Sequence, residues 1–167
     1  MSPSADYWIQ HLQMTKHVEG GSFVEVYRSP MLVAKTSLPE SFKGDRPVST
    51  SIYFLLEKGQ ISALHKIASD ELWHFYYGDP LEVFEIDQAG ILTVHRLGNN
   101  PESGQVFQCC IKAGSWFGSK VADNGTYSLV GCTVAPGFDF ADFELANRET
   151  LIREFPLHEE TIRKLTY

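Results

Sequence analysis

Hydrophobic and polar residues alternate along most of this chain in short runs, the pattern of β-strands packed on one face. The runs are rich in β-branched and aromatic residues, and Gly, Pro, Asn or Asp separate them. Many short strands with no long helical stretch between them indicate a sandwich or barrel. We predict strands over 23–28, 31–35, 48–57, 61–67, 71–77, 81–86, 91–96, 105–111, 127–134 and 138–145.

Helical signals are confined to the two ends of the chain. Ser4 and Asn147 are residues that cap helix N-termini, and each precedes a short amphipathic stretch. No repeat, linker or low-complexity tract interrupts the sequence, so we expect one domain over residues 1–167. The predicted helices are 6–14, 148–154 and 158–165.

Composition narrows the class of protein. The 167 residues are 43% hydrophobic and 13% aromatic, which is typical of a globular chain. The net charge is −7, with an isoelectric point of about 5.3. Nucleic acids and anionic membranes attract clustered Lys and Arg, so we expect neither as a partner.

The cysteines and the N-terminus indicate a reducing compartment. Cys109, Cys110 and Cys132 form neither a paired disulfide framework nor a CxxC metal motif. The N-terminus has no basic start followed by an apolar run, and no stretch is long enough to span a membrane. We therefore expect a cytoplasmic protein with reduced thiols.

The residues most suggestive of chemistry lie between two adjacent strands. Gly59, His65, Glu71 and Gly78 are spaced as in the first cupin motif, which this stretch resembles. In a strand, residues two apart share a face. A His from one strand and a Glu from the next therefore converge in the interior, where cupins hold a metal ion.

Two of the four metal ligands implied by the resemblance are replaced. Ile67 stands at the second His of the first motif, and Phe117 at the His of the second motif. A metal held by His65 and Glu71 alone would bind weakly. Strict alternation turns His74 away from Glu71, but a β-bulge near residues 69–70 would reverse it. The metal is therefore unknown, with His65, Glu71 and His74 as the candidate ligands.

A wider set of segments resembles one cupin subfamily, the Cupin-5 or DUF985 family of unknown function. The resemblance runs from about residue 8 to residue 165. It implies an all-β fold: a cupin-type antiparallel β-barrel (jelly roll, or double-stranded β-helix) with short flanking helices. It also implies a homodimer, similar in shape to sugar-nucleotide epimerases and plant hormone-binding cupins. The segments are HxEGGxF at 17–23, YRS at 27–29, TxIYFLL at 50–56, DExWHFYxGDPL at 70–81, AGSWF at 113–117, YSLVGCTVAPGF at 127–138 and DFEL at 142–145.

The candidate catalytic residues are His65 and Glu71, because a carboxylate beside an imidazole raises its pKa and fixes its tautomer. Aromatic rings fill small barrels and also line ligand pockets, and a strand Arg can hold an anion or pair on the outer surface. The candidate ligand-binding residues are Tyr53, Trp73, His74, Phe75, Trp116, Arg28 and His17.

Three functions stay open on the sequence. The first is a non-redox isomerase, epimerase or lyase acting on a sugar-like or heterocyclic molecule through His65 and Glu71. The second is a cupin that binds or senses a small molecule without chemistry, and the third, less favoured, is a metal-dependent oxygenase. No cofactor motif occurs, so the cofactor is unknown. The strand 23–28 is our candidate for the edge that pairs two copies in a homodimer.

Overall fold

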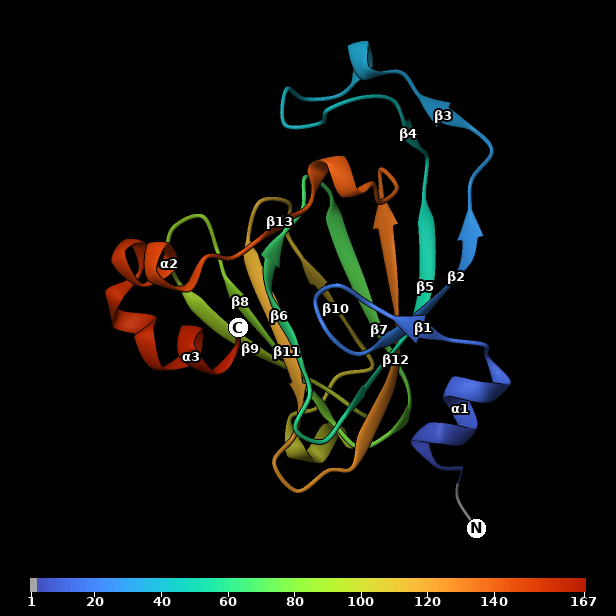
Figure 1. Ribbon diagram of the computed structural model, residues 1–167, viewed down its shortest axis with the longest axis vertical. Coiled ribbons are helices and arrows are strands. Elements are labelled where there is room, and N and C mark those ends of the chain that lie inside the picture. Colours follow the sequence, from blue (N-terminus) through green and yellow to red (C-terminus); the bar gives the residue numbers. More distant parts are fainter. Residues whose placement is uncertain (1–2) are drawn as a thin grey trace.

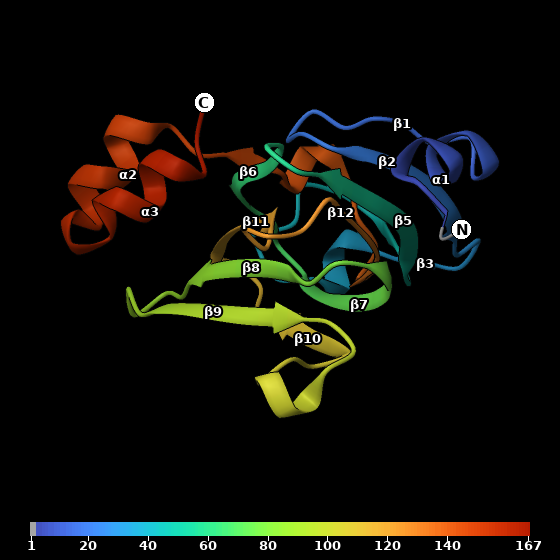
Figure 2. The same cartoon turned by 90° about the horizontal axis from the view of Figure 1, so that it is seen from below.

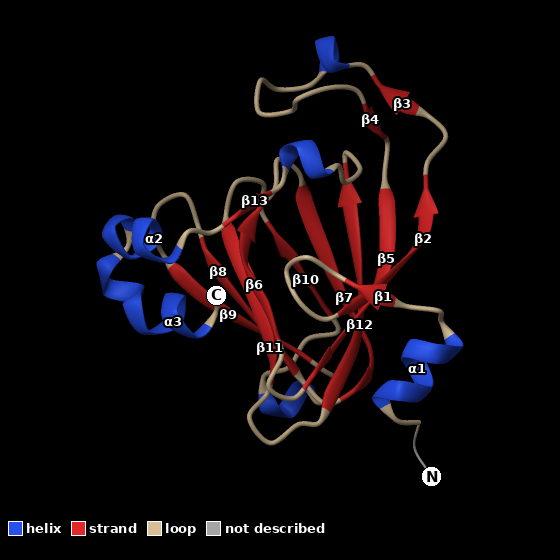
Figure 3. Ribbon diagram, in the orientation of Figure 1, coloured by secondary structure: helices blue, strands red, loops and turns tan. Residues whose placement is uncertain are grey.

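The computed structural model describes residues 3–167, and most of its elements are strands (Figures 1 and 3). The strands are β1 (Thr15–Lys16), β2 (Ser22–Arg28), β3 (Leu32–Val33), β4 (Arg46–Pro47), β5 (Thr50–Glu57), β6 (Ile61–Lys66), β7 (Asp70–Gly78), β8 (Leu81–Ile86), β9 (Leu92–Leu97), β10 (Gln108–Ile111), β11 (Trp116–Val121), β12 (Tyr127–Ala135) and β13 (Glu144–Leu145). The helices are α1 (Ala5–His11), α2 (Arg148–Glu154) and α3 (Glu159–Lys164), with 3-10 turns η1 (Lys35–Ser37), η2 (Pro101–Ser103), η3 (Phe140–Asp142) and η4 (Pro156–His158).

The strands form two antiparallel sheets that face each other (Figure 2). One sheet has six strands in the order β1-β2-β5-β12-β7-β10, and the other has five in the order β13-β6-β11-β8-β9. Consecutive strands of the chain often lie in different sheets, as in a jelly roll. The predicted all-β architecture with short flanking helices is confirmed.

The space between the sheets holds the main hydrophobic core, because alternate residues of each strand point inward. On β12, Val130, Cys132 and Val134 face this core, whereas Tyr127 and Leu129 pack on the other side against α1. Trp73 and Phe117 lie at the centre of the core and are almost completely buried. Side chains therefore fill the space between the sheets. A ligand cavity can lie only at the edge of this packed core.

The three α-helices cover the outer faces of the sheets (Figure 1). α1 packs Trp8 and Ile9 on the six-stranded sheet, and α2 and α3 pack Leu151 and Ile162 on the five-stranded sheet. The predicted caps are present: Ser4 Oγ accepts a hydrogen bond from the amide of Tyr7, and the Asn147 side chain accepts one from Thr150. Among residues 3–167, no helix is long and apolar enough to cross a membrane.

Several elements differ from the sequence prediction, and the strand expected over 31–35 is the two-residue β3 followed by η1. β11 was missed, because Gly118, Ser119 and Lys120 weaken its strand pattern, yet it is the central strand of its sheet. The predicted strand 138–145 is wrong: it folds as the 3-10 turn η3 and the two-residue strand β13. α1 ends at His11, earlier than predicted, before Gln13, which has a positive φ of 55°.

An arm of chain between β2 and β5 extends beyond the sheets and contains the small β3–β4 pair (Figure 1). A buried ion pair ties its base to the loop after β12, with Arg46 Nε 2.6 Å from Asp142 Oδ2. The backbone amide of Lys43 donates a further hydrogen bond to Asp142 Oδ1. This contact fixes η3, which carries part of the wall of the site described next.

Candidate functional site

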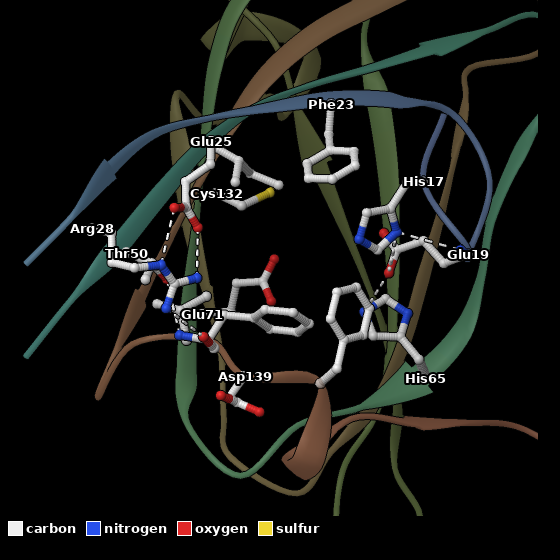
Figure 4. Close-up of a pocket in the computed structure, with 14 residues that line it drawn as sticks. His17, Glu19, Phe23, Glu25, Arg28, Thr50, His65, Glu71, Cys132 and Asp139 are labelled. Carbon is white, nitrogen blue, oxygen red and sulfur yellow. Dashed lines mark hydrogen bonds and ion pairs between the residues drawn. The ribbon is translucent and has the colours of Figure 1, made fainter. Parts of the chain in front are cut away.

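A cavity of about 310 Å³ opens at the edge of the main core, close to the loop after β12 (Figure 4). Its size is at the lower end of that of small-molecule pockets. Side chains from both sheets and from two loops line it. The walls are made of apolar side chains, and titratable side chains project into the interior. The lining residues are His17, Glu19, Phe23, Glu25, Arg28, Thr50, Ile52, His65, Glu71, Cys132, Val134, Phe138, Asp139 and Phe140.

Glu71 reaches this cavity from the second residue of β7. Its carboxyl group points into the open centre (Figure 4), and the residue is only 7% exposed. Burial, together with the nearby Glu19 carboxyl, raises the pKa of Glu71 to about 8, while the adjacent Cys132 thiol lowers it. At neutral pH, Glu71 is therefore a neutral carboxylic acid that can donate a proton or a hydrogen bond.

His65 lies on β6, and both of its ring nitrogens have partners. Nδ1 is 2.7 Å from the carbonyl oxygen of Ala63, so Nδ1 carries a proton and donates it. Nε2 lies 3.2 Å from Glu19 Oε2. Burial lowers the pKa of His65 to about 4, so the ring is neutral at pH 7. The sequence paired His65 with Glu71, but the carboxylate that contacts its ring is that of Glu19.

Glu19 is the site residue that the sequence analysis missed. It precedes Gly20 and Gly21, which have φ angles of 114° and 71° and form the turn between β1 and β2. A Cβ at Gly20 would collide with the carbonyl oxygen of Ile61, so this turn requires glycine. The turn directs the Glu19 side chain inward, where Ser62 Oγ donates to its Oε1 at 2.9 Å. The signal in the sequence was an acidic residue directly before a glycine pair in the 17–23 segment.

Burial raises the pKa of Glu19 above its usual range. Its Oε2 faces the lone pair of His65 Nε2 at 3.2 Å and lies 3.5 Å from His17 Nδ1. A proton on Oε2 completes the contact with His65 Nε2 without placing a net charge in the interior, while His17 Nδ1 accepts the Glu19 amide hydrogen instead. Glu19 and His65 thus share one proton and form a buried dyad.

His17 lines the same cavity from the loop before β2. The backbone amide of Glu19 donates to His17 Nδ1 at 3.3 Å, so the neutral ring carries its proton on Nε2. Burial lowers the pKa of His17, which keeps the ring neutral. Phe140 stacks on the imidazole with ring centroids 6.0 Å apart. The role of His17 in binding stays a prediction.

Arg28 sits at the rim of the cavity, where its side chain is 44% exposed. Its guanidinium binds the Glu25 carboxylate through Nε and Nη2, at 3.0 and 2.6 Å, and Nη1 donates to the carbonyl oxygen of Phe138. Asp139 is the other charged residue of the rim. The rim therefore carries two carboxylates against one guanidinium.

Five predicted ligand-binding residues do not line the cavity. Trp73 and Phe75 point between the sheets but belong to the core, and Trp73 is 1% exposed. Tyr53 and His74 lie on the opposite face, where His74 Nε2 is 3.2 Å from Thr133 Oγ1. Trp116 packs on the outer side, with the Lys66 ammonium 4.4 Å above its ring. The sequence analysis expected these five residues in the pocket, and the structure places them outside it. The presence of an aromatic side chain does not show whether a residue lies in the core, in a pocket or on the outer face of a sheet.

The irregularity in β7 lies after His74 rather than before it. β12 pairs with β7 in continuous register from Asp70 to Phe75, and the shift comes next, leaving Tyr76 unpaired. The bulge that could have turned His74 toward Glu71 is therefore absent at residues 69–70. His74 points away from the cavity.

The residues of this site do not fit the metal that cupins commonly hold. Ile67 and Phe117, at two of the ligand positions, are buried apolar side chains next to His65. The His65 nitrogens face Ala63 and Glu19, and Glu71 holds its proton at neutral pH. Within residues 3–167, no group of three or more His, Cys, Asp or Glu side chains is arranged to hold a metal ion.

The family model described as "Cupin superfamily (DUF985)" matches residues 6–146. The chain belongs to this family. The resemblance inferred from the ordered segments is thus confirmed.

Similar proteins have been solved without an assigned activity. Protein SO0799 from Shewanella oneidensis is 37% identical, with a TM-score of 0.89 over 99% of each chain. A hypothetical protein from Leishmania major is 36% identical, with a TM-score of 0.91 over 99% of each chain. The uncharacterized protein YML079W of Saccharomyces cerevisiae is 28% identical over 80% of this chain and 71% of its own length.

More distant structures share the fold alone. A cupin 2 domain-containing protein from Halorhodospira halophila is 15% identical, with a TM-score of 0.56 over 92% of this chain and 87% of its own. Bacillus subtilis oxalate decarboxylase is 18% identical, with a TM-score of 0.55, and 36% of its chain is covered. No reaction follows from these likenesses, because one fold hosts many functions.

Proposed function

We propose that this cupin is a non-redox acid–base enzyme, an isomerase, epimerase or lyase, that moves a proton on a small organic molecule in the cavity. Glu71 is the proton donor, and Glu19 together with His65 is the proton acceptor. The roles of His65 and Glu71 predicted from the sequence are kept, with Glu19 inserted between His65 and the substrate. A ring-shaped molecule such as a sugar or a heterocycle suits the aromatic walls.

The observation that carries this proposal is a neutral carboxylic acid facing a proton-sharing dyad across one small cavity. Burial holds Glu71 in its protonated form at neutral pH, with a pKa of about 8. The dyad is held in place by Ser62 and Ala63 and needs no solvent contact. Enzymes that transfer protons use such pairs, whose surroundings shift their pKa values away from the usual range.

Every proton that moves in one half-reaction has a donor and an acceptor. The substrate loses a proton from carbon to a Glu19 oxygen, and Glu19 passes its own proton to His65 Nε2. Glu71 donates its proton to the substrate atom that gains the electron pair of the broken C–H bond. Return of the protons in a different position gives the isomer, and no oxidant or reductant takes part.

Hydrogen exchange tests this function even while the overall reaction is unidentified. Protein and candidate sugars or heterocycles are incubated in deuterated water, and deuterium on carbon is measured by NMR and mass spectrometry. A substrate will gain deuterium with the wild type and at least roughly 100-fold more slowly with Glu71→Gln. His74→Gln, which alters a histidine outside the cavity, will exchange like the wild type.

A non-catalytic binding protein is the second candidate. The contact that favours it is the one between Glu19 and His65, because each satisfies the other without a ligand. A compound that is co-purified with the protein, identified by mass spectrometry and recovered without deuterium after long incubation would support this alternative. It would also contradict the proposed enzyme.

We also propose that two copies pair through β2 to form a homodimer. β1 covers only the start of β2, at Ser22 and Phe23, so the rest of this sheet edge is open. Val26 and Tyr27 expose more than half of their surface there. Such an edge is usually covered by another strand. Light scattering should give twice the chain mass for the wild type and a monomer mass for Val26→Lys.

A further inference from the structure

Two side chains project into the open centre of the cavity from different elements. Figure 4 shows the Glu71 carboxyl group on one side and, on the other, the His17 ring nitrogen that does not face Glu19. Glu71 comes from β7, and His17 from the loop before β2. Both residues line the same cavity, and in this view its open centre lies between them.

The proton on His17 is assigned by its neighbours. Nδ1 accepts the amide hydrogen of Glu19, and the Glu19 carboxyl lies 3.5 Å from the same nitrogen. The remaining nitrogen, Nε2, carries the proton and is a donor toward the cavity. Phe140 and Phe23 pack against the faces and edge of the ring and fix its plane.

The cavity thus offers two hydrogen-bond donors that face its open centre. Glu71 is buried and is part of no ion pair among the described residues, which favours a neutral carboxyl group that donates its hydrogen, and His17 donates through Nε2. The surrounding walls are apolar side chains of Phe23, Ile52 and Val134. A ligand group placed here must accept hydrogen bonds, and a cationic group has no counter-charge.

The charges at the rim disfavour a ligand that is already anionic. Glu25 and Asp139 both lie there, and Arg28 is already bound to Glu25. A neutral carbonyl compound passes this rim without repulsion. Its oxygen develops negative charge only after the adjacent C–H proton has left, when two preorganised donors stabilise it most.

We propose that His17 and Glu71 together hold one oxygen atom of the substrate, and that the substrates are small neutral carbonyl compounds that react through an enolate-like state. This proposal rests on the proposed function and adds the substrate class and a second catalytic residue, His17. A neutral carboxylic acid acting as a donor to such an oxygen is an established device in proton-transfer enzymes.

Phenols test this assignment, since a phenolate oxygen resembles an enolate oxygen. The probe is para-nitrophenol, whose absorbance reports its ionisation, and the matched control ligand is para-nitroanisole, which cannot ionise. The wild type should bind para-nitrophenol with a shifted absorbance and para-nitroanisole at least tenfold more weakly. His17→Gln and Glu71→Gln should each weaken para-nitrophenol binding about tenfold or more, because a hydrogen bond to a charged oxygen is lost or weakened. His74→Gln should bind like the wild type.

Nitrogen-15 NMR of the wild type gives a readout that does not depend on a variant folding. Free protein should show His17 protonated on Nε2, and para-nitrophenol should shift that signal while leaving His74 unchanged. Equal binding of the phenol and the anisole, no binding by the wild type at millimolar ligand, or an unmoved His17 signal would each overturn the proposal. Deuterium exchange without phenol binding would leave the proposed enzyme standing and remove this substrate class.

Discussion

A glutamate–histidine contact in the cavity and another on the outside of the molecule have different surroundings. In the cavity, His65 and Glu19 are 3.2 Å apart with side chains 4% and 9% exposed. On β8 and β9, His95 and Glu85 are 2.8 Å apart with side chains 23% and 10% exposed. The outer pair is shorter but less deeply buried, and burial lowers the pKa of His65 in the cavity pair to about 4. Desolvation, more than the length of the contact, therefore sets the protonation of the cavity histidine.

The cavity pair also faces a third titratable group, Glu71, whereas the outer pair accepts a backbone hydrogen bond from Lys112. Burial raises the pKa of Glu71 and of Glu19 and lowers that of His65, so it favours the uncharged form of all three groups. The predictions below separate the two regions, beginning with the largest expected effect.

The first prediction concerns Glu71→Gln and the dependence of stability on pH. Folding raises the Glu71 pKa from 4.5 to about 8, so the folded state holds a proton that the unfolded chain has released. That contribution to stability is present below pH 4.5 and is lost as the pH rises to 8. Glu71→Gln should therefore gain stability over the wild type across this range, reaching roughly 3–5 kcal/mol above pH 8. Urea unfolding at several pH values measures it.

Glu85→Gln is the matched control for that experiment, since it alters the carboxylate of the outer pair. The same unfolding series on Glu85→Gln shows what removal of a carboxylate outside the cavity does to stability at each pH. Parallel curves for Glu71→Gln and the wild type would show that Glu71 ionises normally, and the proton donor of the proposed mechanism would be lost.

The second prediction concerns acid and His65. Folding lowers the His65 pKa from 6.5 to about 4, so the unfolded chain binds a proton first. Stability from this group is present above pH 6.5 and is lost as the pH falls to 4, by roughly 2–3 kcal/mol. His65→Gln should flatten the decline, and His95→Gln, which alters a histidine outside the cavity, is the matched control. Equal slopes for the wild type and His65→Gln would place the acid sensitivity elsewhere.

The third prediction compares the two pairs directly through double-mutant cycles with alanine. The coupling between Glu19 and His65 should be about 1–2 kcal/mol, because the contact is buried and removal of one partner leaves the other unsatisfied. The coupling between Glu85 and His95 should be about 0.5 kcal/mol or less, since water reaches His95. Chemical denaturation of the four variants in each cycle gives both values. A larger coupling for the outer pair would reverse the comparison.

The family and most strands could be predicted because they depend on patterns among residues that are close together in the sequence. Alternation identified β5, β8 and β12, and Gly59, His65, Glu71 and Gly78 marked the first cupin motif. The capping residues Ser4 and Asn147 located α1 and α2. β11 escaped prediction because its small polar residues lack alternation, although the neighbouring strands bury them.

The site could be predicted only in part. Alternation placed His65 and Glu71 in the interior, and the structure brings both to one cavity. Glu19 was missed because its contact with His65 is made by a turn far away in the chain. The aromatic walls of the cavity come from Phe23 of β2 and from Phe138 and Phe140 of the loop after β12, rather than from the tryptophans favoured by the sequence.

The sequence by itself determined the cupin family, the antiparallel strands, the helix caps and the replacement of two metal ligands by Ile67 and Phe117. These features follow from local periodicity and motif spacing, and both can be recognised among residues that are neighbours in the sequence. Only the tertiary structure decided that Glu19 is the partner of His65 and that His17 presents a donor opposite Glu71. The protonation of these groups depends on burial between two sheets, and burial is a property of the assembled fold.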